Sequence, residues 1–406
     1  MNQDQIIIRE LAKRYMEIAC SEKQQKAVAR MRATNDLKIV RPPVLMDEIP
    51  WYQMNINDEL TCLCEDERAR KLELYLRTAL FREKHFRCDA IFEPCYKVRR
   101  AYDSTGFGIE AEENILRTDD QNNIVSHQYA DVLENEAVVE RMRIPQFTLR
   151  PDKDEEKMAY YTDLLGDSMP VVLSGNRPYY HAPWDKIARL RGVEPILFDL
   201  YDRPEHLHNI RKKYFDAAVA ELDFIEANGL VDPDPTTLHC TPGYVSGLGE
   251  SGLKATWFRG MAQCFSEVSP AMLEEFDIDY MIPLAERFGY SYYGCCEPLD
   301  RRMDAVKKLP NLRKIGVSPW SDEEMSAEAI GKNYVYARKP NPANVAMQTD
   351  PKVIREETEK TVRICQKYGC PVEFVLKDIS TVSHRPENLI VWADTVAEVL
   401  DHYYGE

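Results

Sequence analysis

The sequence predicts an α/β fold, specifically a (β/α)8 TIM barrel with an N-terminal helical extension. Short strand candidates alternate with longer amphipathic helices along most of the chain, which is typical of repeated βα units. The length of 406 residues also suits one large α/β barrel with additions. We expect residues 1–40 to form the helical extension and residues 41–406 to form the barrel.

Eight strand candidates support this fold. One lies near Val44, and the other seven are short runs bounded by turn residues, at Ala90–Glu93, Pro170–Leu173, Met261–Phe265, Tyr290–Tyr293, Lys314–Val317, Tyr334–Tyr336 and Val372–Leu376. An open, doubly wound sheet is the alternative. Against it, the segment Gly106-Phe107-Gly108 lacks the third glycine and the flanks of a dinucleotide-binding turn.

Helix boundaries between the strands are marked in the sequence. Asp202 and Glu205 have the spacing of a capping box at the start of one helix. Asp350-Pro351 begins another helix, which runs to Gly369, and proline is at the first helical position, where its missing N–H group costs nothing. These signals predict long helices on both sides of short strands.

The chain is acidic, with a formal net charge of −16 and 30% charged residues. A surface of this charge repels phosphate backbones and anionic lipids, so we expect neither nucleic-acid nor membrane binding. No apolar run approaches the roughly 20 residues of a membrane span, and the N-terminus shows no signal-peptide pattern. We therefore expect a cytoplasmic protein whose 11 cysteines are reduced thiols.

The residues just past the carboxyl ends of barrel strands line the active site in folds of this kind. In this chain those positions carry mostly thiols, carboxylates and imidazoles, namely Glu93, Cys95, Glu267, Cys295, Cys296, Glu297, Ser318, Trp320, Asp378 and His384, while His239 and Cys240 belong to a less regular segment. Thiolates together with imidazole and carboxylate groups are the ligands that zinc prefers. The sequence therefore predicts a metal site built from His239, Cys295, Cys296, Glu297 and His384.

The strongest single feature is the segment Tyr292–Leu299, which contains two adjacent cysteines and Glu297. Because side chains alternate between the two faces of a strand, we expect one cysteine to be a ligand and the other to pack. Both could instead be core cysteines. His384 and His239 also have a structural alternative, which for His384 is capping of the helix that follows it.

Three segments resemble the second half of the uroporphyrinogen decarboxylase and cobalamin-dependent methyltransferase superfamily. They are Asp202-Arg203-Pro204-Glu205, Ser269–Phe276 leading to the Cys295-Cys296 strand, and His384–Leu389, which resembles the family's closing "P-x-E-N" segment. The resemblance covers roughly residues 160–400. Two family zinc ligands are missing: Gly294-Cys295-Cys296 stands in place of His-x-Cys, and Asp378, Ser383 and His384 lie where the last cysteine is expected.

The resemblance implies a zinc-dependent methyltransferase that moves a methyl group between a corrinoid protein and either a thiol or a small methylated substrate, such as a methoxylated aromatic or a methylamine. Zinc would act as a Lewis acid. A partner protein would supply the corrinoid, because the chain has no Asp-x-His-x-x-Gly segment. The superfamily also suggests a homodimer.

The resemblance also suggests roles for residues at the strand ends. Tyr292, Tyr293 and Trp320 would line an apolar substrate pocket, unless they are barrel core. Glu267 and Asp378 are the candidate catalytic carboxylates, and they would serve the main alternative, a metal-free decarboxylase or lyase of the same superfamily. A non-catalytic binding protein is the third hypothesis.

Overall fold

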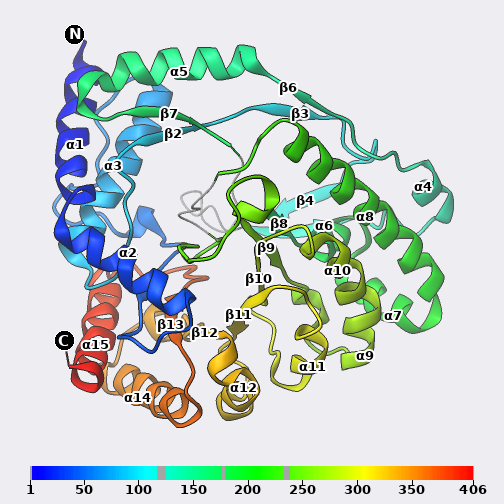
Figure 1. Cartoon of the computed structure of the whole chain (residues 1–406). Coiled ribbons are helices and arrows are strands. Elements are labelled where there is room, and N and C mark those ends of the chain that lie inside the picture. Colours follow the sequence, from blue (N-terminus) through cyan, green and yellow to red (C-terminus); the bar gives the residue numbers. More distant parts are fainter. Residues whose placement is uncertain (1, 117–124, 176–178, 233–237, 406) are drawn as a thin grey trace.

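The computed structural model describes residues 2–116, 125–175, 179–232 and 238–405. Its central element is a seven-stranded parallel sheet. From one edge to the other the strands are β1 (Val44–Met46), β13 (Val372–Leu376), β12 (Val335–Arg338), β11 (Leu312–Val317), β10 (Tyr290–Tyr293), β9 (Trp257–Gly260) and β8 (Tyr179–His181). From β8 to β13, strands that are consecutive in the chain are neighbours in the sheet, and the connecting helices lie on its outer side (Figure 1).

Helices make up most of the rest of the described chain. They are α1 (Gln3–Ala19), α2 (Glu22–Asn35), α3 (Glu67–His85), α4 (Glu136–Arg141), α5 (Pro151–Leu165), α6 (Pro183–Arg191), α7 (Val193–Asp202), α8 (Pro204–Ala227), α9 (Pro270–Leu273), α10 (Asp279–Ala285), α11 (Met303–Val306), α12 (Glu323–Ile330), α13 (Ala343–Ala346), α14 (Pro351–Tyr368) and α15 (Glu387–Tyr404). Within the described ranges, none of these helices has both the length and the apolar character that crossing a bilayer requires.

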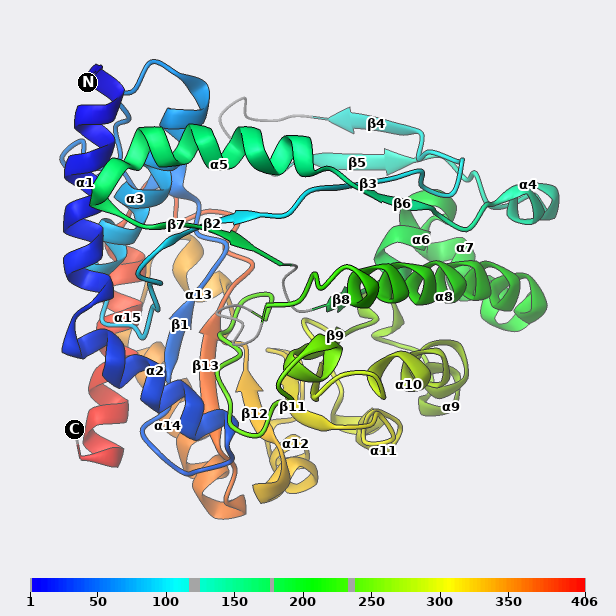
Figure 2. The same ribbon diagram turned by 45° about the horizontal axis from the view of Figure 1, so that its top comes forward.

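Three short strand pairs lie outside the main sheet. β2 (Tyr96–Arg99) pairs in parallel with β7 (Val171–Ser174), while β3 (Tyr102–Ser104) pairs with β6 (Phe147–Leu149) and β4 (Glu113–Leu116) with β5 (Ser126–Tyr129), both antiparallel. Figure 2 shows these pairs together with α5 on one side of the molecule. This part of the chain is not built from repeated βα units.

The predicted N-terminal helical extension consists of α1 and α2. The apolar face of α1, with Leu11 and Tyr15, packs in one buried cluster with Leu72 and Leu76 of α3 and Leu165 of α5. Burial of this face ties the extension to the following helices through the hydrophobic effect. The domain boundary at residue 40 stays a prediction.

The α/β class is confirmed, with a parallel sheet and helices between its strands. Strand candidates near Val44 and at Pro170–Leu173, Tyr290–Tyr293, Lys314–Val317, Tyr334–Tyr336 and Val372–Leu376 correspond to strands within one or two residues. No ladder joins β8 back to β1 among the described residues. The closed eight-stranded barrel therefore stays a prediction, and the described residues form a seven-stranded parallel sheet.

Two predicted strands are wrong. Ala90–Glu93 forms no strand, because the Gln24 side chain donates to the Ala90 carbonyl (2.8 Å) and accepts from the Phe92 N–H (2.8 Å), replacing the neighbour that a strand would need. The candidate at Met261–Phe265 lies too late, since the strand there is β9 and residues 263–265 form a 3₁₀ turn.

Gly294 ends β10 and sets the direction of the chain that follows it. Its φ of 94° lies in the left-handed region that favours glycine, and a Cβ atom there would lie 2.4 Å from Leu299 Cδ1. Its backbone also packs closely on Gly316 of the neighbouring strand β11. The sequence thus uses glycine where the strand must turn sharply at the carboxyl edge of the sheet.

We expect Gly294→Ala to lower the free energy of unfolding by about 3 kcal/mol, through the left-handed φ and the overpacking against Leu299. Gly369→Ala is the matched control. Gly369 has a φ of 70° but no heavy atom within 4 Å of the added Cβ, so we expect a loss of about 1 kcal/mol. Urea unfolding followed by circular dichroism measures both, and equal losses would contradict the tight turn.

Candidate functional site

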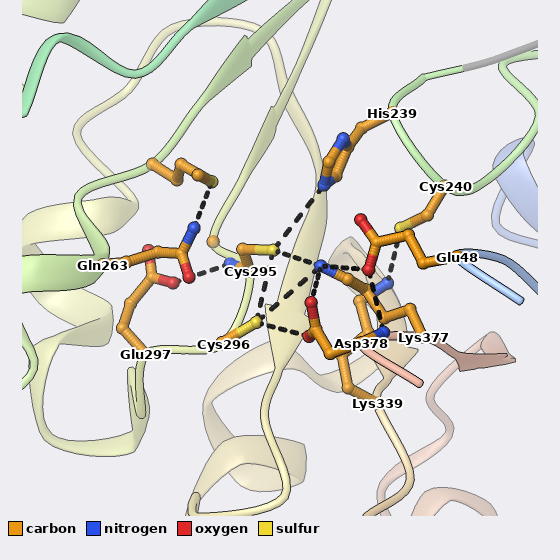
Figure 3. Close-up of polar contacts among 12 residues, drawn as sticks. Glu48, His239, Cys240, Gln263, Cys295, Cys296, Glu297, Lys339, Lys377 and Asp378 are labelled. Atoms are coloured by element: carbon orange, nitrogen blue, oxygen red, sulfur yellow. Dashed lines mark hydrogen bonds and ion pairs between the residues drawn. The ribbon is translucent and has the colours of Figure 1, made fainter. Parts of the chain in front are cut away.

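Reactive side chains gather where β10, β12 and β13 end (Figure 3). Cys295 and Cys296 follow β10, Lys339 follows β12, and Lys377 and Asp378 follow β13. Because parallel strands point the same way, their carboxyl ends meet at one edge of the sheet. Residues that are far apart in the sequence therefore share one site.

The two cysteines contact each other. Their Sγ atoms are 3.6 Å apart, with Cys295 buried and Cys296 partly exposed. The expected alternation of faces does not apply, because β10 ends at Tyr293 and the chain turns at Gly294 before it reaches them. The structure buries Cys295 and leaves Cys296 partly exposed, and which of the two would be a metal ligand stays a prediction.

Lys377 is the cation of this cluster. Its Nζ lies 3.1 Å from Cys295 Sγ, 3.8 Å from Cys296 Sγ and 3.0 Å from Asp378 Oδ1, and its side chain is 3% exposed. Glu48 adds a carboxylate 3.8 Å from Nζ and accepts the Asp378 N–H at 2.8 Å. A nearly buried ammonium group is thus surrounded by sulfur and carboxylate oxygen.

Charge in this cluster favours a thiolate at Cys295. The hydrogen bond from Cys296 lowers the pKa of Cys295 most, and the His239 contact and the charges of Arg259 and Lys377 lower it further, against burial, which raises it. The same Cys295–Cys296 hydrogen bond, together with burial, raises the pKa of Cys296, which also donates to Asp378 Oδ2 at 2.8 Å. Cys295 is therefore the thiolate of the pair, and Cys296 is the thiol.

The charge of Lys377 is maintained by its neighbours. Burial alone would lower the pKa of Lys377, but the negative charges of the Cys295 thiolate and Asp378 raise it above its ordinary range. The ammonium form therefore persists at neutral pH. The Lys377 ammonium and the Cys295 thiolate therefore stabilise each other's charge.

Glu297 has a structural role in this arrangement. Its carboxylate accepts the N–H groups of Cys295 (2.9 Å) and Ala262 (3.3 Å), so it binds the backbone beneath the cysteines rather than either sulfur. Burial, and then the charge on Cys295, raises the pKa of Glu297 to about 7. It fixes the turn that presents the thiols.

His239 lies at the other side of Cys295. Its Nε2 is 3.9 Å from Cys295 Sγ, and its ring stacks on Tyr180 with 5.3 Å between centroids. It reaches the cluster from a turn bridged by Leu238 and Thr241. His239 is therefore a neighbour of the thiolate, and its role as a metal ligand stays a prediction.

Other candidate residues are placed differently. His384 is exposed, and its ring lies edge-on against Tyr52 at 6.3 Å; Glu267 is exposed after the 3₁₀ turn of residues 263–265. Within the described residues, neither side chain hydrogen-bonds to the cluster of Cys295, Cys296, Lys377 and Asp378. Tyr292 and Tyr293 are fully buried, Tyr292 under Arg259 and Tyr293 hydrogen-bonded to Asp277, so both belong to the interior.

A pocket of about 410 Å³ opens past the ends of β10–β13. Its lining is mostly apolar apart from a few polar groups and comprises Cys296, Pro319, Trp320, Lys339, Pro340, Asn341, Pro342, Ala343, Ala346, Lys377, Asp378, Ser380 and Thr381. Trp320 thus lies at the pocket, as the sequence predicted. A larger hollow of about 800 Å³ among α2, α3 and α15 is lined by surface ion pairs and holds none of the cluster residues.

Zinc needs several donors around one point, with neighbouring ligand atoms about 3.7 Å apart. The two sulfurs meet this distance. However, no group of three or more His, Cys, Asp or Glu side chains in the described residues is arranged to hold a metal ion. The Lys377 ammonium also lies against both sulfurs and would repel a second cation there. The arrangement does not fit zinc bound at both sulfurs, and zinc stays a prediction of the sequence.

Sequence reasoning missed the lysines, Glu48 and Arg259. Lys377 directly precedes Asp378 at a predicted strand end, and Lys339 follows the strand candidate at Tyr334–Tyr336. The same rule that selected Asp378 could therefore have selected both lysines. However, a lysine usually lies on the surface, so neither residue stood out in the sequence.

The chain was also compared with known proteins. No protein-family model matches its sequence, and no curated protein matches it. Among solved structures, it is similar to a methyltransferase from Methanosarcina mazei, with a TM-score of 0.52 and 12% identity over 93% of this chain and 99% of that chain. The two proteins share a fold.

We expect Cys295 to remain a thiolate at mildly acidic pH, because its lowered pKa means that the charge is lost only as pH falls through that value. Ultraviolet absorbance of the thiolate, taken as wild type minus Cys295→Ser, would follow this titration. Lys377→Met should move the titration upward by about one to three pH units, since an adjacent cation is removed.

Lys367→Met is the control for this titration, because Lys367 is an exposed lysine of α14 that pairs with Glu324. It should leave the titration unchanged. A Cys295 thiol that ionises only above neutral pH in the wild type would contradict the thiolate assignment.

Proposed function

We propose that this chain catalyses methyl transfer. In this proposal it binds a small methylated molecule in the pocket past β10–β13 and prepares the methyl group for transfer to a corrinoid carried by a partner protein. The fold shared with a methyltransferase and the location of the pocket at the carboxyl edge of a parallel sheet support it. The observation that carries it is the nearly buried ammonium group of Lys377, a residue that lines this pocket.

Methyl transfer from an ether needs stabilisation of the departing oxygen. The acceptor's electron pair forms the new bond to carbon, while the electron pair of the C–O bond remains on oxygen, which leaves as an oxyanion. Lys377 and Cys296 both line the pocket, and the Lys377 ammonium can donate a hydrogen bond to that oxygen. Donors fixed in a site of low dielectric constant stabilise such a charge strongly.

Cys295 acts through Lys377 in this scheme. It is buried and does not line the pocket, so it does not touch the substrate. Its thiolate lies 3.1 Å from the Lys377 Nζ and keeps that group charged and in place. Cys295 is therefore a positioning residue, and Lys377 does the charge stabilisation that the resemblance assigns to zinc. A bound corrinoid would supply the nucleophile that accepts the methyl group.

The charges of the pocket favour a methoxylated aromatic over a methylamine. Lys339 and Lys377 both line it, and their ammonium groups would repel a cationic amine. Trp320 and the prolines suit a flat apolar ring. The homodimer expected from the resemblance stays a prediction.

A metal-free decarboxylase is the second candidate, and the same two ammonium groups favour it because they suit a substrate carboxylate. Of the carboxylates predicted for this reaction, Asp378 lines the pocket and Glu267 does not. Release of carbon dioxide from an aromatic acid, with chelator present and no corrinoid, would select this reaction over methyl transfer.

We expect the purified protein to demethylate a methoxylated aromatic when it is given reduced cobalamin. Formation of methylcobalamin and of the free phenol, followed by absorbance and chromatography, measures the reaction. Lys377→Met should lower kcat by about 100-fold, because it removes a donor to the leaving oxygen. Lys367→Met should keep the wild-type rate.

Zinc content is measured in the same samples. In our account the activity survives chelation, and added zinc does not restore Lys377→Met. Two results would refute the proposal: no methyl transfer from any methoxylated or methylamine donor, or full activity of the zinc-loaded Lys377→Met variant.

A further inference from the structure

Lys339 is a buried cation that the proposed reaction does not use. Lys339 is one of the residues that line the 410 Å³ pocket, and it is only 2% exposed. Lys339 follows β12 and Lys377 follows β13, the adjacent strand, so the two lysines enter the site side by side (Figure 3). A buried ammonium group is unfavourable unless an anion accompanies it.

The other buried lysines have anionic partners. Lys314 Nζ lies 2.7 Å from Glu373 Oε2, and both side chains are fully buried. Lys377 contacts the Cys295 thiolate and Asp378, as described above. The buried carboxylate of Glu373 is engaged by Lys314 and by the Thr241 hydroxyl at 2.8 Å. Glu373, Asp378 and the Cys295 thiolate are therefore already in contact with Lys314 or Lys377.

Lys339 lacks such a partner within residues 2–116, 125–175, 179–232 and 238–405. Its Nζ donates to Cys240 Sγ at 3.5 Å and to no carboxylate within 4.0 Å. Burial raises the pKa of Cys240, although Lys339 opposes this, so Cys240 is a neutral thiol. Arg259 adds a second buried cation over the same Tyr292 ring, and it donates to backbone carbonyls.

We propose that Lys339 binds a carboxylate of the substrate, so that the pocket takes small aromatic acids. Burial lowers the pKa of Lys339, but nearby groups, among them Glu373 and the Cys295 thiolate, raise it overall. The ligand would add an anion in direct contact with the Lys339 ammonium. The neighbouring surfaces of Trp320, Pro340 and Pro342 suit the flat ring of such an acid. This inference rests on the proposed function only in taking this pocket as the substrate site.

Binding can be tested without catalysis, by titration calorimetry with no corrinoid present. The probes are 4-methoxybenzoate, its neutral analogue 4-methoxybenzamide, and inorganic phosphate. The acid should bind about thirtyfold more tightly than the amide, since a buried charge pair is formed. Lys339→Met should abolish that difference, while Lys332→Met, which changes an exposed lysine, should preserve it.

Thermal unfolding of the ligand-free variants gives a second, independent readout. Lys339→Met removes an unpaired buried charge, so its Tm should equal or exceed that of the wild type. Lys314→Met is the matched control, and its Tm should fall because Glu373 loses its partner.

Three results would overturn the inference: equal binding of acid and amide, tighter binding of phosphate than of the acid, or a fall in Tm for Lys339→Met as large as that for Lys314→Met. The last would mean that Lys339 has an anionic partner within the protein. Tight binding of the acid without methyl transfer would refute the proposed reaction and leave this inference standing.

Discussion

The ammonium group of Lys377 balances the negative charges of the candidate site. It lies among the Cys295 thiolate, the Cys296 thiol and the Asp378 carboxylate, with Glu48 at the rim. Removing it would leave like charges in contact in a poorly hydrated place, where repulsion is strong. Each neighbour in turn supports the charge of Lys377. The cluster is therefore one electrostatic unit, whose members cannot be replaced singly without changing the protonation of the others.

The fold provides this unit through two backbone features. Parallel strands β10 and β13 bring their carboxyl ends to one edge of the sheet, which places Cys295 and Cys296 beside Lys377 and Asp378 across about 80 residues of sequence. The turn at Gly294 then brings both sulfurs together, and Glu297 holds that turn through the Cys295 N–H. The adjacent pocket takes its apolar wall from the segments after β11 and β12. A charged wall beside an apolar one suits a flat, anionic molecule.

The strand periodicity predicted the parallel sheet and several strand positions, because apolar side chains buried on both faces leave a clear signal at Tyr290–Tyr293 and Val372–Leu376. The strand prediction failed at Ala90–Glu93. There the Gln24 side chain makes the hydrogen bonds to Ala90 and Phe92 that a neighbouring strand would otherwise make. The strand prediction also placed β9 several residues too late. This strand contains Arg259, which is buried although arginine usually lies on the surface. Interior polar contacts, which the sequence does not reveal, therefore account for these errors.

The site was predictable to a similar extent. Strand-end positions identified Cys295, Cys296, Trp320 and Asp378, and His239 was added from an irregular turn. The lysines were missed because a lysine usually lies on the surface, and only tertiary structure shows that Lys339 and Lys377 are buried. His384 was misplaced because the loop after β13 directs it toward Tyr52. The sequence indicates which residue types lie at the carboxyl edge of the sheet. It does not show which of their side chains point into the site.

The most direct test of the account is a crystal structure of the protein grown with zinc supplied, with anomalous diffraction recorded at the zinc absorption edge. The account predicts no zinc signal at the two sulfurs, and a Lys377 Nζ within hydrogen-bond distance of Cys295 Sγ. A zinc ion bonded to both Cys295 and Cys296, with Lys377 displaced from them, would contradict it.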